Sequence, residues 1–306
     1  MSIATLISVI VRVLVFVAIG VALRVFGALR REDSRALNAV IVYVALPALI
    51  FRTVVAAPLS TELIRAAAVA WAVSIVGLFF AAEIAHAMRL PRKTAAAFVI
   101  VAALGNTGYL GYPLVAALLG PRWLPEAVFY DVFGTVAVLF TLGIAVAARY
   151  GEHEGPLNVA RELLTFPAVI AMLVALAYRF VPWPAAVSTT VSSWTGLAAN
   201  VAVPLIMVSL GVSLDLSALK GSWRPLAAVS GMKLLVLPAA AIGIAFVVGD
   251  RQGMPLLALQ AGMPSLMLSL VVGQRFKLDV GFIAAAILVT TIGCVVTIPL
   301  VQLLVR

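Results

Sequence analysis

The sequence predicts an all-α polytopic membrane protein with ten transmembrane helices, arranged as two inverted five-helix repeats with broken, crossing helices four and nine. Three observations support this fold class. The chain of 306 residues is 64% hydrophobic and only 11% charged, with a mean hydropathy of +1.18, whereas soluble domains are about half apolar and about a quarter charged. Apolar stretches of about 20 residues, the length that crosses a bilayer, recur along the chain. Similar proline motifs recur about half a chain length apart.

The apolar stretches define the ten expected helices, because each is long enough to cross a hydrocarbon core of about 30 Å. Short polar or basic segments separate them. They cover residues 3–24, 36–57, 62–88, 94–119, 125–148, 162–181, 191–214, 224–248, 252–274 and 279–305. The segment from Met1 to Gly20 has neither a basic flank nor an obvious cleavage site, so we expect it to remain as helix one.

The distribution of Lys and Arg predicts the orientation. The loops after helices one, three, five, seven and nine hold about twice as many of these residues as the loops on the opposite side. The positive-inside rule therefore predicts a multi-pass protein of the cell inner membrane with both termini outside. The net charge of +9 is spread over these short loops, which argues against nucleic-acid binding, because that function needs basic residues clustered on one exposed face.

Two pairs of motifs predict the internal repeat. Val44–Ile50 (VALPALI) in helix two resembles Val201–Met207 (VAVPLIM) in helix seven, and Pro113 in helix four corresponds to Pro264 in helix nine. Since five is an odd number, two consecutive five-helix repeats lie in opposite orientations in the membrane. The expected organisation is a first repeat over residues 1–150, a cytoplasmic linker over 151–161 and an inverted second repeat over 162–306.

Helix four has a polar, glycine-rich centre, Gly105–Pro113 (GNTGYLGYP), and helix nine has a related segment, Gln260–Ser265 (QAGMPS). Backbone groups that a helix break frees at membrane depth must be satisfied inside protein or in a water-filled cavity. If the two breaks cross, half-helix N-termini present N–H donors and partial positive charge there, which suits an anion. The alternative reading is a pair of kinks that let helices pack closely through small residues.

Four ionisable residues fall within the expected helices, where a charge costs about 2.5–3.5 kcal/mol on insertion scales and usually faces the protein interior. Asp131 in helix five is either a proton- or cation-coupling carboxylate or a charge that pairs helices. Lys233 in helix eight is expected to extend toward the cytoplasmic interface, and Glu83 is expected at an interface. Arg12 has no evident partner in the sequence. The sequence assigns no role to Arg12, Glu83 or Lys233.

Signatures of enzymes and of metal sites are missing from the sequence. The two histidines, His86 and His153, are too far apart for an HExxH zinc motif, and no G-x-S-x-G nucleophile elbow is present. The single Cys294 cannot form an intramolecular disulfide. We therefore expect no enzyme activity, no catalytic residue, no cofactor and no metal.

The ordered motifs resemble those of the auxin efflux carrier family, which includes plant PIN-type carriers and bacterial malonate or malate permease-like proteins. The resemblance covers essentially the whole chain and is carried by Leu46–Phe51, Gly105–Leu114, Lys233–Leu235 with Pro238, Met263–Ser265, Thr290–Thr291 and Thr297–Pro299. It implies a scaffold domain, a transport domain and a substrate site where helices four and nine cross. The resemblance carries over to that site Asn106, Tyr109, Pro113, Met263, Pro264 and Ser265. Polarity and position add Thr107 and Gln260 as substrate-binding residues and Asp131 as the coupling residue.

The resemblance and the expected anion site together predict a secondary transporter that moves a small organic anion, a carboxylate, across the inner membrane by alternating access. The long hydrophilic loop of the plant carriers is missing between the repeats, so auxin is not assumed. A sodium-coupled symporter of the bile-acid type and a non-transport membrane receptor or scaffold remain alternatives. The expected partners are the organic anion and membrane lipid, and no nucleic acid. H⁺ or Na⁺ as coupling ion, a homodimer, the substrate and the direction of transport stay open.

Overall fold

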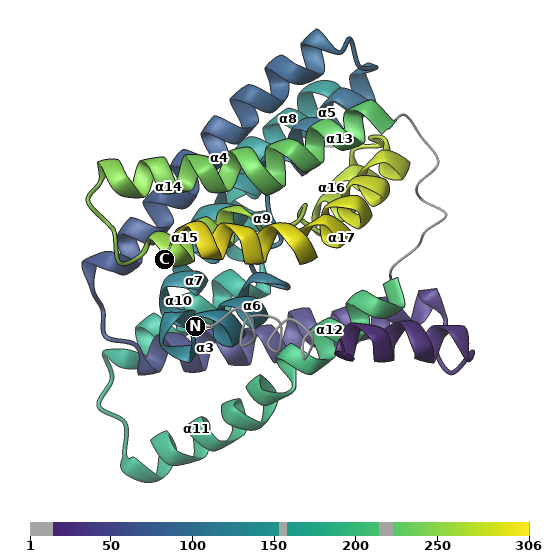
Figure 1. Ribbon diagram of the computed structural model, residues 1–306. Helices are drawn as coiled ribbons and strands as arrows, with labels where there is room; N and C mark the ends of the chain where they lie inside the picture. The colour runs from purple at the N-terminus through teal and green to yellow at the C-terminus, as the bar shows by residue number, and fades with distance from the viewer. Residues whose placement is uncertain (1–14, 153–157, 214–222, 306) are drawn as a thin grey trace. The chain divides into compact units, whose positions relative to one another are not determined.

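The computed structural model describes residues 15–152, 158–213 and 223–305, and it is helical over these ranges apart from connections and one isolated β-bridge (Figure 1). The predicted all-α class is therefore confirmed. Arg12, His153 and the middle of the expected linker lie outside the described residues. Packing divides the chain into two compact units. The first unit comprises residues 1–60, 112–128 and 160–214, and the second comprises 61–111, 129–159 and 215–306.

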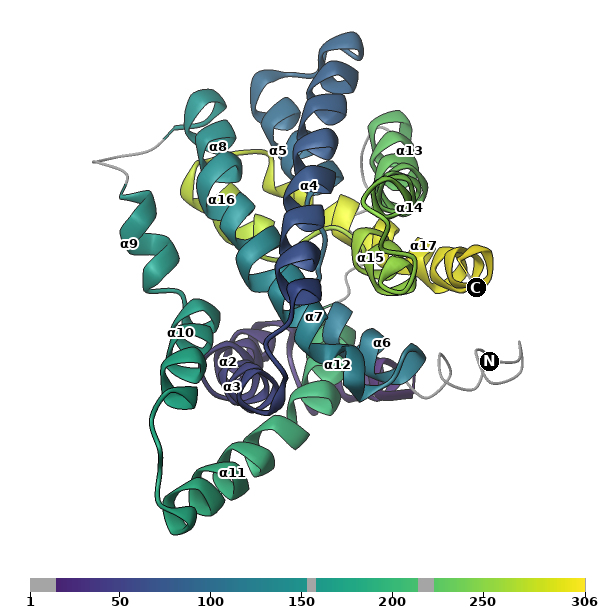
Figure 2. The ribbon, with the colours of Figure 1, turned by 90° about the vertical axis from the view of Figure 1, so that its left-hand side faces the viewer.

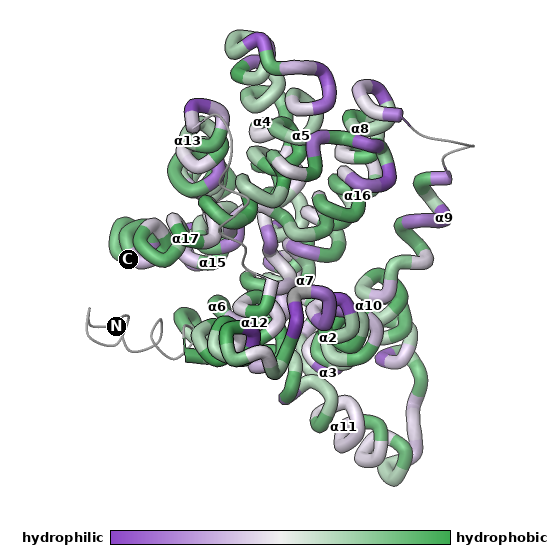
Figure 3. The backbone as a smooth tube through the Cα atoms, turned by 90° about the vertical axis from the view of Figure 1, so that its right-hand side faces the viewer, coloured by the Kyte–Doolittle hydropathy of each residue, from purple (hydrophilic) through white to green (hydrophobic). Residues whose placement is uncertain are grey.

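Six helices of the described residues are long and apolar enough to cross a membrane. They are Ser34–Ala56, Thr61–Ala87, Pro121–Tyr150, Ala185–Ser213, Trp223–Val247 and Val280–Leu304. Two shorter apolar helices cover Val15–Val25 and Pro167–Arg179. Large apolar side chains such as Phe79, Phe246 and Leu300 are more than half exposed, and Figure 3 shows most helical turns in the green of hydrophobic residues. The multi-pass membrane character is confirmed, whereas the count of ten spans stays a prediction.

The first unit is built around α3. Its helical elements are the apolar helix Val15–Val25, η1 (Arg31–Asp33), α2 (Ser34–Val40), η2 (Ile41–Ala45), α3 (Leu46–Ala56), most of α6 (Gly111–Leu118), η3 (Pro121–Trp123), most of α7 (Leu124–Phe129) and of α9 (Val159–Leu164), α10 (Pro167–Arg179), α11 (Ala185–Asn200) and α12 (Ala202–Ser213). Helices α10 and α11 both pack on α3. The Arg179 guanidinium donates to the carbonyls of Val54, Val55 and Ala57. These carbonyls lie at the C-terminal end of α3 or just after it, where carbonyls have no hydrogen-bond partner within the helix.

Close glycine contacts join the first apolar helix to α12 in the first unit. A Cβ added to Gly20 would lie 3.0 Å from the Cα of Gly211, so the two backbones approach as small residues allow in membrane proteins. The helix expected over residues 162–181 is not continuous, and that expectation is wrong. It is divided into α9 (Val159–Leu164) and α10, because Phe166 precedes Pro167 and adopts an extended conformation.

The second unit holds the larger core. Its helical elements are α4 (Thr61–Ala87), α5 (Arg92–Ala103), η4 (Tyr130–Val136), η5 (Leu139–Gly143), α8 (Ile144–Tyr150), α13 (Trp223–Gly231), η7 (Met232–Val236), α14 (Leu237–Val247), α15 (Met254–Ala261), α16 (Ser269–Arg275) and α17 (Val280–Leu304). Helix α4 packs on α5, η4 and α14, and α17 packs on α5, α13, α15 and α16. A Cβ on Gly134 would overlap the methyl group of Ala70, so glycine permits the close approach of η4 to α4.

Short π-helical turns interrupt several helices, and two of them end two positions before a proline. The turn η2 is followed by Pro47 at the start of α3, and η7 is followed by Pro238 at the start of α14. Proline has no N–H to donate and its ring clashes with the preceding turn, so the helix widens locally. Asp131 lies in η4 and Lys233 lies in η7. These two buried charged residues of the second unit thus come from π-helical turns, a form common at functional sites.

A charged cluster joins the start of α5, the end of α8 and the loop after α16 in the second unit. The Nζ of Lys93 donates to Oε1 of Glu152 at 2.7 Å, and the Nζ of Lys277 lies 3.6 Å from Oε2. Thr94 donates to Asp279 at 2.8 Å beside it. Loops that the sequence analysis assigns to one side of the membrane therefore lie together at one end of this unit.

This cluster predicts a small pH effect on stability. The hydrogen bond from Lys93, followed by the charges of Lys93 and Lys277, lowers the pKa of Glu152. A carboxylate with a lowered pKa stabilises the fold fully above its unfolded pKa, and this stabilisation is lost as the pH falls through its folded pKa. Between neutral pH and about pH 4, the melting temperature of detergent-solubilised native protein should therefore fall more steeply than that of Glu152→Gln. The difference should shrink in high salt, because the pair is exposed. Identical slopes would contradict the assignment.

Candidate functional site

Two helices are interrupted, and their non-helical segments meet inside the second unit. Helix α5 ends at Ala103 and α6 (Gly111–Leu118) begins eight residues later, while α15 ends at Ala261 and α16 begins at Ser269. Figure 2 shows α15 and α16 as separate helices joined by a non-helical connection. We call the segments 104–110 and 262–268 the first and second break.

Backbone hydrogen bonds join the two breaks. The Asn106 N–H donates to the Pro264 carbonyl at 2.7 Å, and the Leu266 N–H donates to the Leu104 carbonyl at 3.0 Å. Gly105 and Ser265 form an isolated antiparallel bridge. Each break therefore satisfies backbone groups that the other leaves without helical partners, as membrane depth requires.

Ser265 fixes the second break to its surroundings. Its hydroxyl donates to the Val101 carbonyl at 2.8 Å, near the C-terminal end of α5, and its N–H donates to the hydroxyl of Thr290 at 3.0 Å. Both Ser265 and Thr290 are fully buried. The Ser265 hydroxyl thus supplies a donor to one of the last carbonyls of a helix. Thr290 belongs to a motif that carries the family resemblance, but it is not among the predicted site residues.

Asn106 presents an unsatisfied polar atom at the meeting point. Its carbonyl accepts from Leu110 and Gly111, and its side chain is 3% exposed. Within the described residues, no donor lies within hydrogen-bond distance of Asn106 Oδ1. A buried polar atom without a partner costs free energy. The side chain therefore has unused hydrogen-bonding capacity at the crossing.

Thr107, Asp131 and Gln260 form a buried polar cluster on the first break. The hydroxyl of Thr107 donates to Oδ1 of Asp131 at 2.5 Å, and Gln260 Nε2 donates to the Thr107 carbonyl at 3.4 Å. Asp131 is 5% exposed and Gln260 is fully buried. A Cβ added to Gly108 would lie 2.8 Å from Oδ2 of Asp131. The carboxylate thus lies directly against the unwound backbone.

Lys233 lies on the other side of the first break. Its side chain is 2% exposed, and its Nζ donates to the carbonyl of Ala261 at 2.7 Å. A Cβ added to Gly105 would lie 3.0 Å from this Nζ. The expectation that Lys233 extends to the cytoplasmic interface is therefore wrong, because the ammonium is engaged inside the protein. Glu83, by contrast, is exposed near the end of α4.

The remaining predicted site residues shape the breaks. Met263 is fully buried and Pro264 is buried, both in the second break, while Tyr109 is partly buried in the turn that closes the first. Pro113 lies in the first turn of α6, where the chain continues into the first unit. The second unit thus brings together Asn106, Thr107, Tyr109, Asp131, Gln260, Met263, Pro264 and Ser265.

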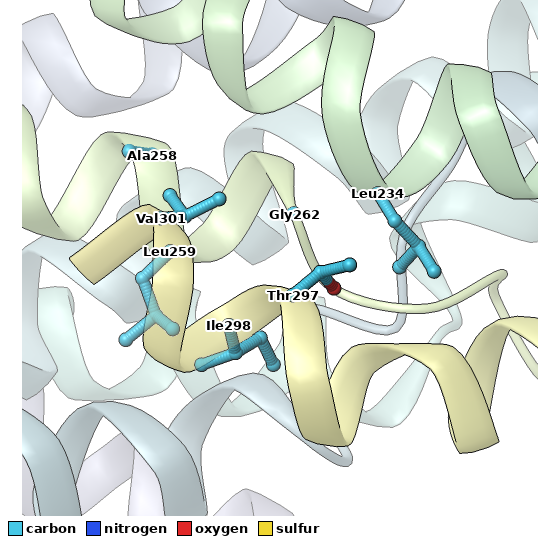
Figure 4. A pocket seen from close by; sticks show the side chains of 7 residues that line it. All are labelled: Leu234, Ala258, Leu259, Gly262, Thr297, Ile298 and Val301. Carbon is cyan, nitrogen blue, oxygen red and sulfur yellow. The ribbon is translucent and has the colours of Figure 1, made fainter. Parts of the chain in front are cut away.

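A small pocket lies beside the second break (Figure 4). Its empty space of about 170 Å³ includes open solvent and leaves no room for a water molecule, and it is lined by Leu234, Ala258, Leu259, Gly262, Thr297, Ile298 and Val301. Thr297 supplies the polar side chain of an otherwise apolar lining, so the pocket does not have the chemistry of an anion site. No group of three or more His, Cys, Asp or Glu side chains that could hold a metal lies in the described part of the chain.

Comparison with known proteins gives matches along nearly the whole chain. Residues 5–154 and 156–302 match the sequence profile of the family described as "Membrane transport protein". The chain is 33% identical over 291 residues to an "Uncharacterized transporter" of Methanothermobacter thermautotrophicus, covering 94% of each chain. It is 27% identical over 282 residues to a protein of Rhizobium meliloti named "Putative malonate transporter", covering 88% of this chain and 86% of the relative.

Proposed function

Because this chain belongs to the membrane transport protein family, the auxin efflux carrier family that its motifs resemble, we propose that it is a secondary transporter for a small organic anion of the carboxylate class. It works by alternating access. The printed name of the Rhizobium relative supports a carboxylate such as malonate. The family and its relatives indicate a transporter rather than an enzyme.

The observation that carries the proposal is the buried polar crossing of the two breaks in the second unit. Polar and ionisable groups inside a membrane protein are expensive and are typical of substrate and ion pathways. Here Asn106 Oδ1 is buried without a donor among the described residues. This oxygen would bind a donor group of the substrate, such as a hydroxyl or a protonated carboxyl group, and a carboxylate oxygen would accept from the Nδ2 amide group of the same side chain. The backbone N–H groups freed by the breaks supply further donors.

Each predicted site residue has a place in this proposal. Asn106 and Gln260 supply amide groups, Thr107 orients Asp131, and Tyr109 borders the substrate with its ring. Pro113, Met263 and Pro264 keep the two helices interrupted. Ser265 holds the second break in position, since its hydroxyl is already donated to Val101.

The two compact units support alternating access, in which a transport domain shifts against a scaffold. The second unit, which holds the crossing, would be the transport domain and the first unit the scaffold.

The proposal includes ten helices as inverted repeats over residues 1–150 and 162–306 with a linker at 151–161. It also places the protein in the inner membrane with both termini outside. The charged cluster of Lys93, Glu152 and Lys277 supports the proposal that the loops after helices three, five and nine lie on the same side of the membrane.

Counterflow in proteoliposomes tests the proposal. We expect the native protein to exchange labelled malonate or malate, with indole-3-acetate as a third probe. Asn106→Ala should weaken exchange about 10- to 100-fold, because a hydrogen bond to a charged group is worth about 1.5–3 kcal/mol. Pro264→Ala should also lower it by restoring helix at the second break.

The matched control is Asn200→Ala, since Asn200 is exposed at the end of α11. It should exchange substrate as the native protein does. Unchanged exchange in Asn106→Ala would refute the location of the site. No exchange of any of the three compounds by demonstrably folded native protein would contradict the carboxylate transporter and favour the receptor or scaffold alternative.

A further inference from the structure

We infer that the guanidinium of Arg52, where α3 packs on α11 in the first unit, binds the phosphate of an anionic phospholipid. The inference does not depend on the proposed function. It concerns α3 and α11, and these helices hold none of the predicted substrate-binding residues.

The first support is a positive charge without a protein partner. Arg52 lies four residues before Ala56, the end of α3, within a helix that is long and apolar enough to cross a membrane. Within the described residues, no hydrogen bond or ion pair joins its guanidinium to another side chain or carbonyl. The last carbonyls of α3 are already bound by Arg179. Because a charge at this depth is costly without a partner, the membrane itself must supply the anion.

The second support is the surface on which the guanidinium lies. A Cβ added to Gly196 of α11 would lie 2.7 Å from Nη1 of Arg52 and 3.4 Å from its Cζ. Gly196 is buried whereas Arg52 is exposed, so the guanidinium covers the glycine and still reaches the surface. Ser192 and Ser193 are exposed one turn earlier on α11, and residues three and four positions apart share a helix face. Two hydroxyl groups therefore lie on the same face as the glycine that Arg52 covers.

The third support is the depth of this surface in the membrane. The rings of Tyr178 and Trp183 stack at 5.1 Å just beyond it, and the ring of Phe51 packs edge-on against Tyr178 at 5.2 Å. Tyr and Trp are typical of the boundary between membrane and water. On the other side of Arg52, Val44 and Leu197 are more than half exposed. The guanidinium thus lies between an aromatic boundary and apolar side chains on which acyl chains can pack.

The chemistry of the guanidinium selects the ligand. Its planar N–H fork matches a phosphate group and can donate two parallel hydrogen bonds to it. Phosphatidylcholine carries the same phosphate, but its own quaternary ammonium offsets the negative charge. A headgroup with a net negative charge, such as phosphatidylglycerol, is therefore favoured.

Melting in detergent tests the site. Native protein should melt on the order of 3 °C higher with phosphatidylglycerol than with phosphatidylcholine of the same acyl chains, because a ligand that binds only the folded state stabilises it. Arg52→Gln removes the charge and should lose this difference. Gly196→Ala keeps Arg52, but its methyl group displaces the guanidinium, so it should lose most of the difference as well. Equal melting of native protein in the two lipids would overturn the inference.

Arg122→Gln and Gly243→Ala are the matched controls. Arg122 is exposed in the same unit and lies over the ring of Trp123, and a Cβ on Gly243 meets nothing within 4 Å. Both variants should keep the full difference between the lipids. A full difference in Arg52→Gln, or in Gly196→Ala if Arg52→Gln does not fold, would overturn the inference. An equal loss in Arg122→Gln would overturn it too, since the lipid would then respond to charge in general.

Two further arms identify the source of the phosphate. Inorganic phosphate and glycerol 3-phosphate lack acyl chains, and at the concentration of the lipid neither should raise the melting temperature of native protein. An equal gain from either compound would overturn the assignment to a lipid. In native mass spectrometry, the native protein should retain about one more phosphatidylglycerol per chain than Arg52→Gln. Equal retention would contradict the site, whatever the protein transports.

Discussion

Asp131→Asn is expected to leave the protein folded and able to exchange substrate, but to abolish accumulation driven by a pH gradient. Asp131 is 5% exposed and accepts the hydroxyl of Thr107 at 2.5 Å. Asparagine has the same shape and can accept this bond through its own oxygen, so mainly the ionisable proton is lost. With one coupled proton, a gradient of one pH unit can drive about tenfold accumulation, since one unit corresponds to 1.36 kcal/mol. Without coupling, the accumulation should fall to equilibration.

The decisive comparison is between counterflow without a gradient and net uptake under an imposed pH gradient, both in proteoliposomes. Thr107→Val serves as the control, because it removes the donor to Asp131 and leaves the carboxylate. It should retain a pH response. If Asp131→Asn left both uptake and its pH dependence unchanged, the coupling role would be refuted. Asp131 would then be a charge that only holds helices together.

Gly111→Ala is expected to produce the second large effect, a combined loss of stability and transport. A Cβ at Gly111 would overlap Oε1 of Gln260 and lie 3.1 Å from its Cδ. Gln260 is fully buried and donates to the carbonyl of Thr107, so its side chain cannot move away without losing this bond. Overpacking of this kind costs about 1–3 kcal/mol. The first turn of α6 and the amide of Gln260 should both be displaced from the site.

Gly243→Ala provides the matched control in α14 of the same unit. A Cβ there meets nothing within 4 Å, so alanine should be neutral or stabilise the helix by about 0.5–1 kcal/mol. Melting temperature in detergent and malonate counterflow should separate the two variants. Equal stability and equal transport would show that the close contact between Gly111 and Gln260 does not constrain the site.

Much of the site region could be predicted from the sequence, because the glycine and proline residues that interrupt a helix act on the backbone at their own positions. Glycine and proline interrupt a helix through their own backbone properties. Gly105–Pro113 and Gln260–Ser265 were therefore identified as unusual segments, and the structure interrupts the helix in both. Helices four and nine were also expected to cross at these segments, and the hydrogen bond from the Asn106 N–H to the Pro264 carbonyl joins the two breaks. Their role in substrate binding stays a proposal.

The side-chain contacts at the crossing could not be predicted, because they join residues far apart in the chain. Ser265 and Val101 are 164 positions apart, and Gln260 and Thr107 are 153 apart. Lys233 was predicted at the interface, since a long cationic side chain near a helix end usually reaches water. In the folded protein the ammonium instead lies inside, beside Gly105 and bonded to the carbonyl of Ala261, and these residues are far from Lys233 in the sequence.

The sequence by itself determined the membrane class and the places where helices break. Partitioning into a bilayer depends on the summed hydropathy of each segment, and helix breaking depends on single residues, so both can be read without knowing the fold. Only the tertiary structure decided that Thr107 binds Asp131, that Ser265 binds Val101 and that Lys233 caps α15. These contacts depend on how helices pack and on the π-helical turns that direct the charged side chains, and neither property is encoded in any one segment.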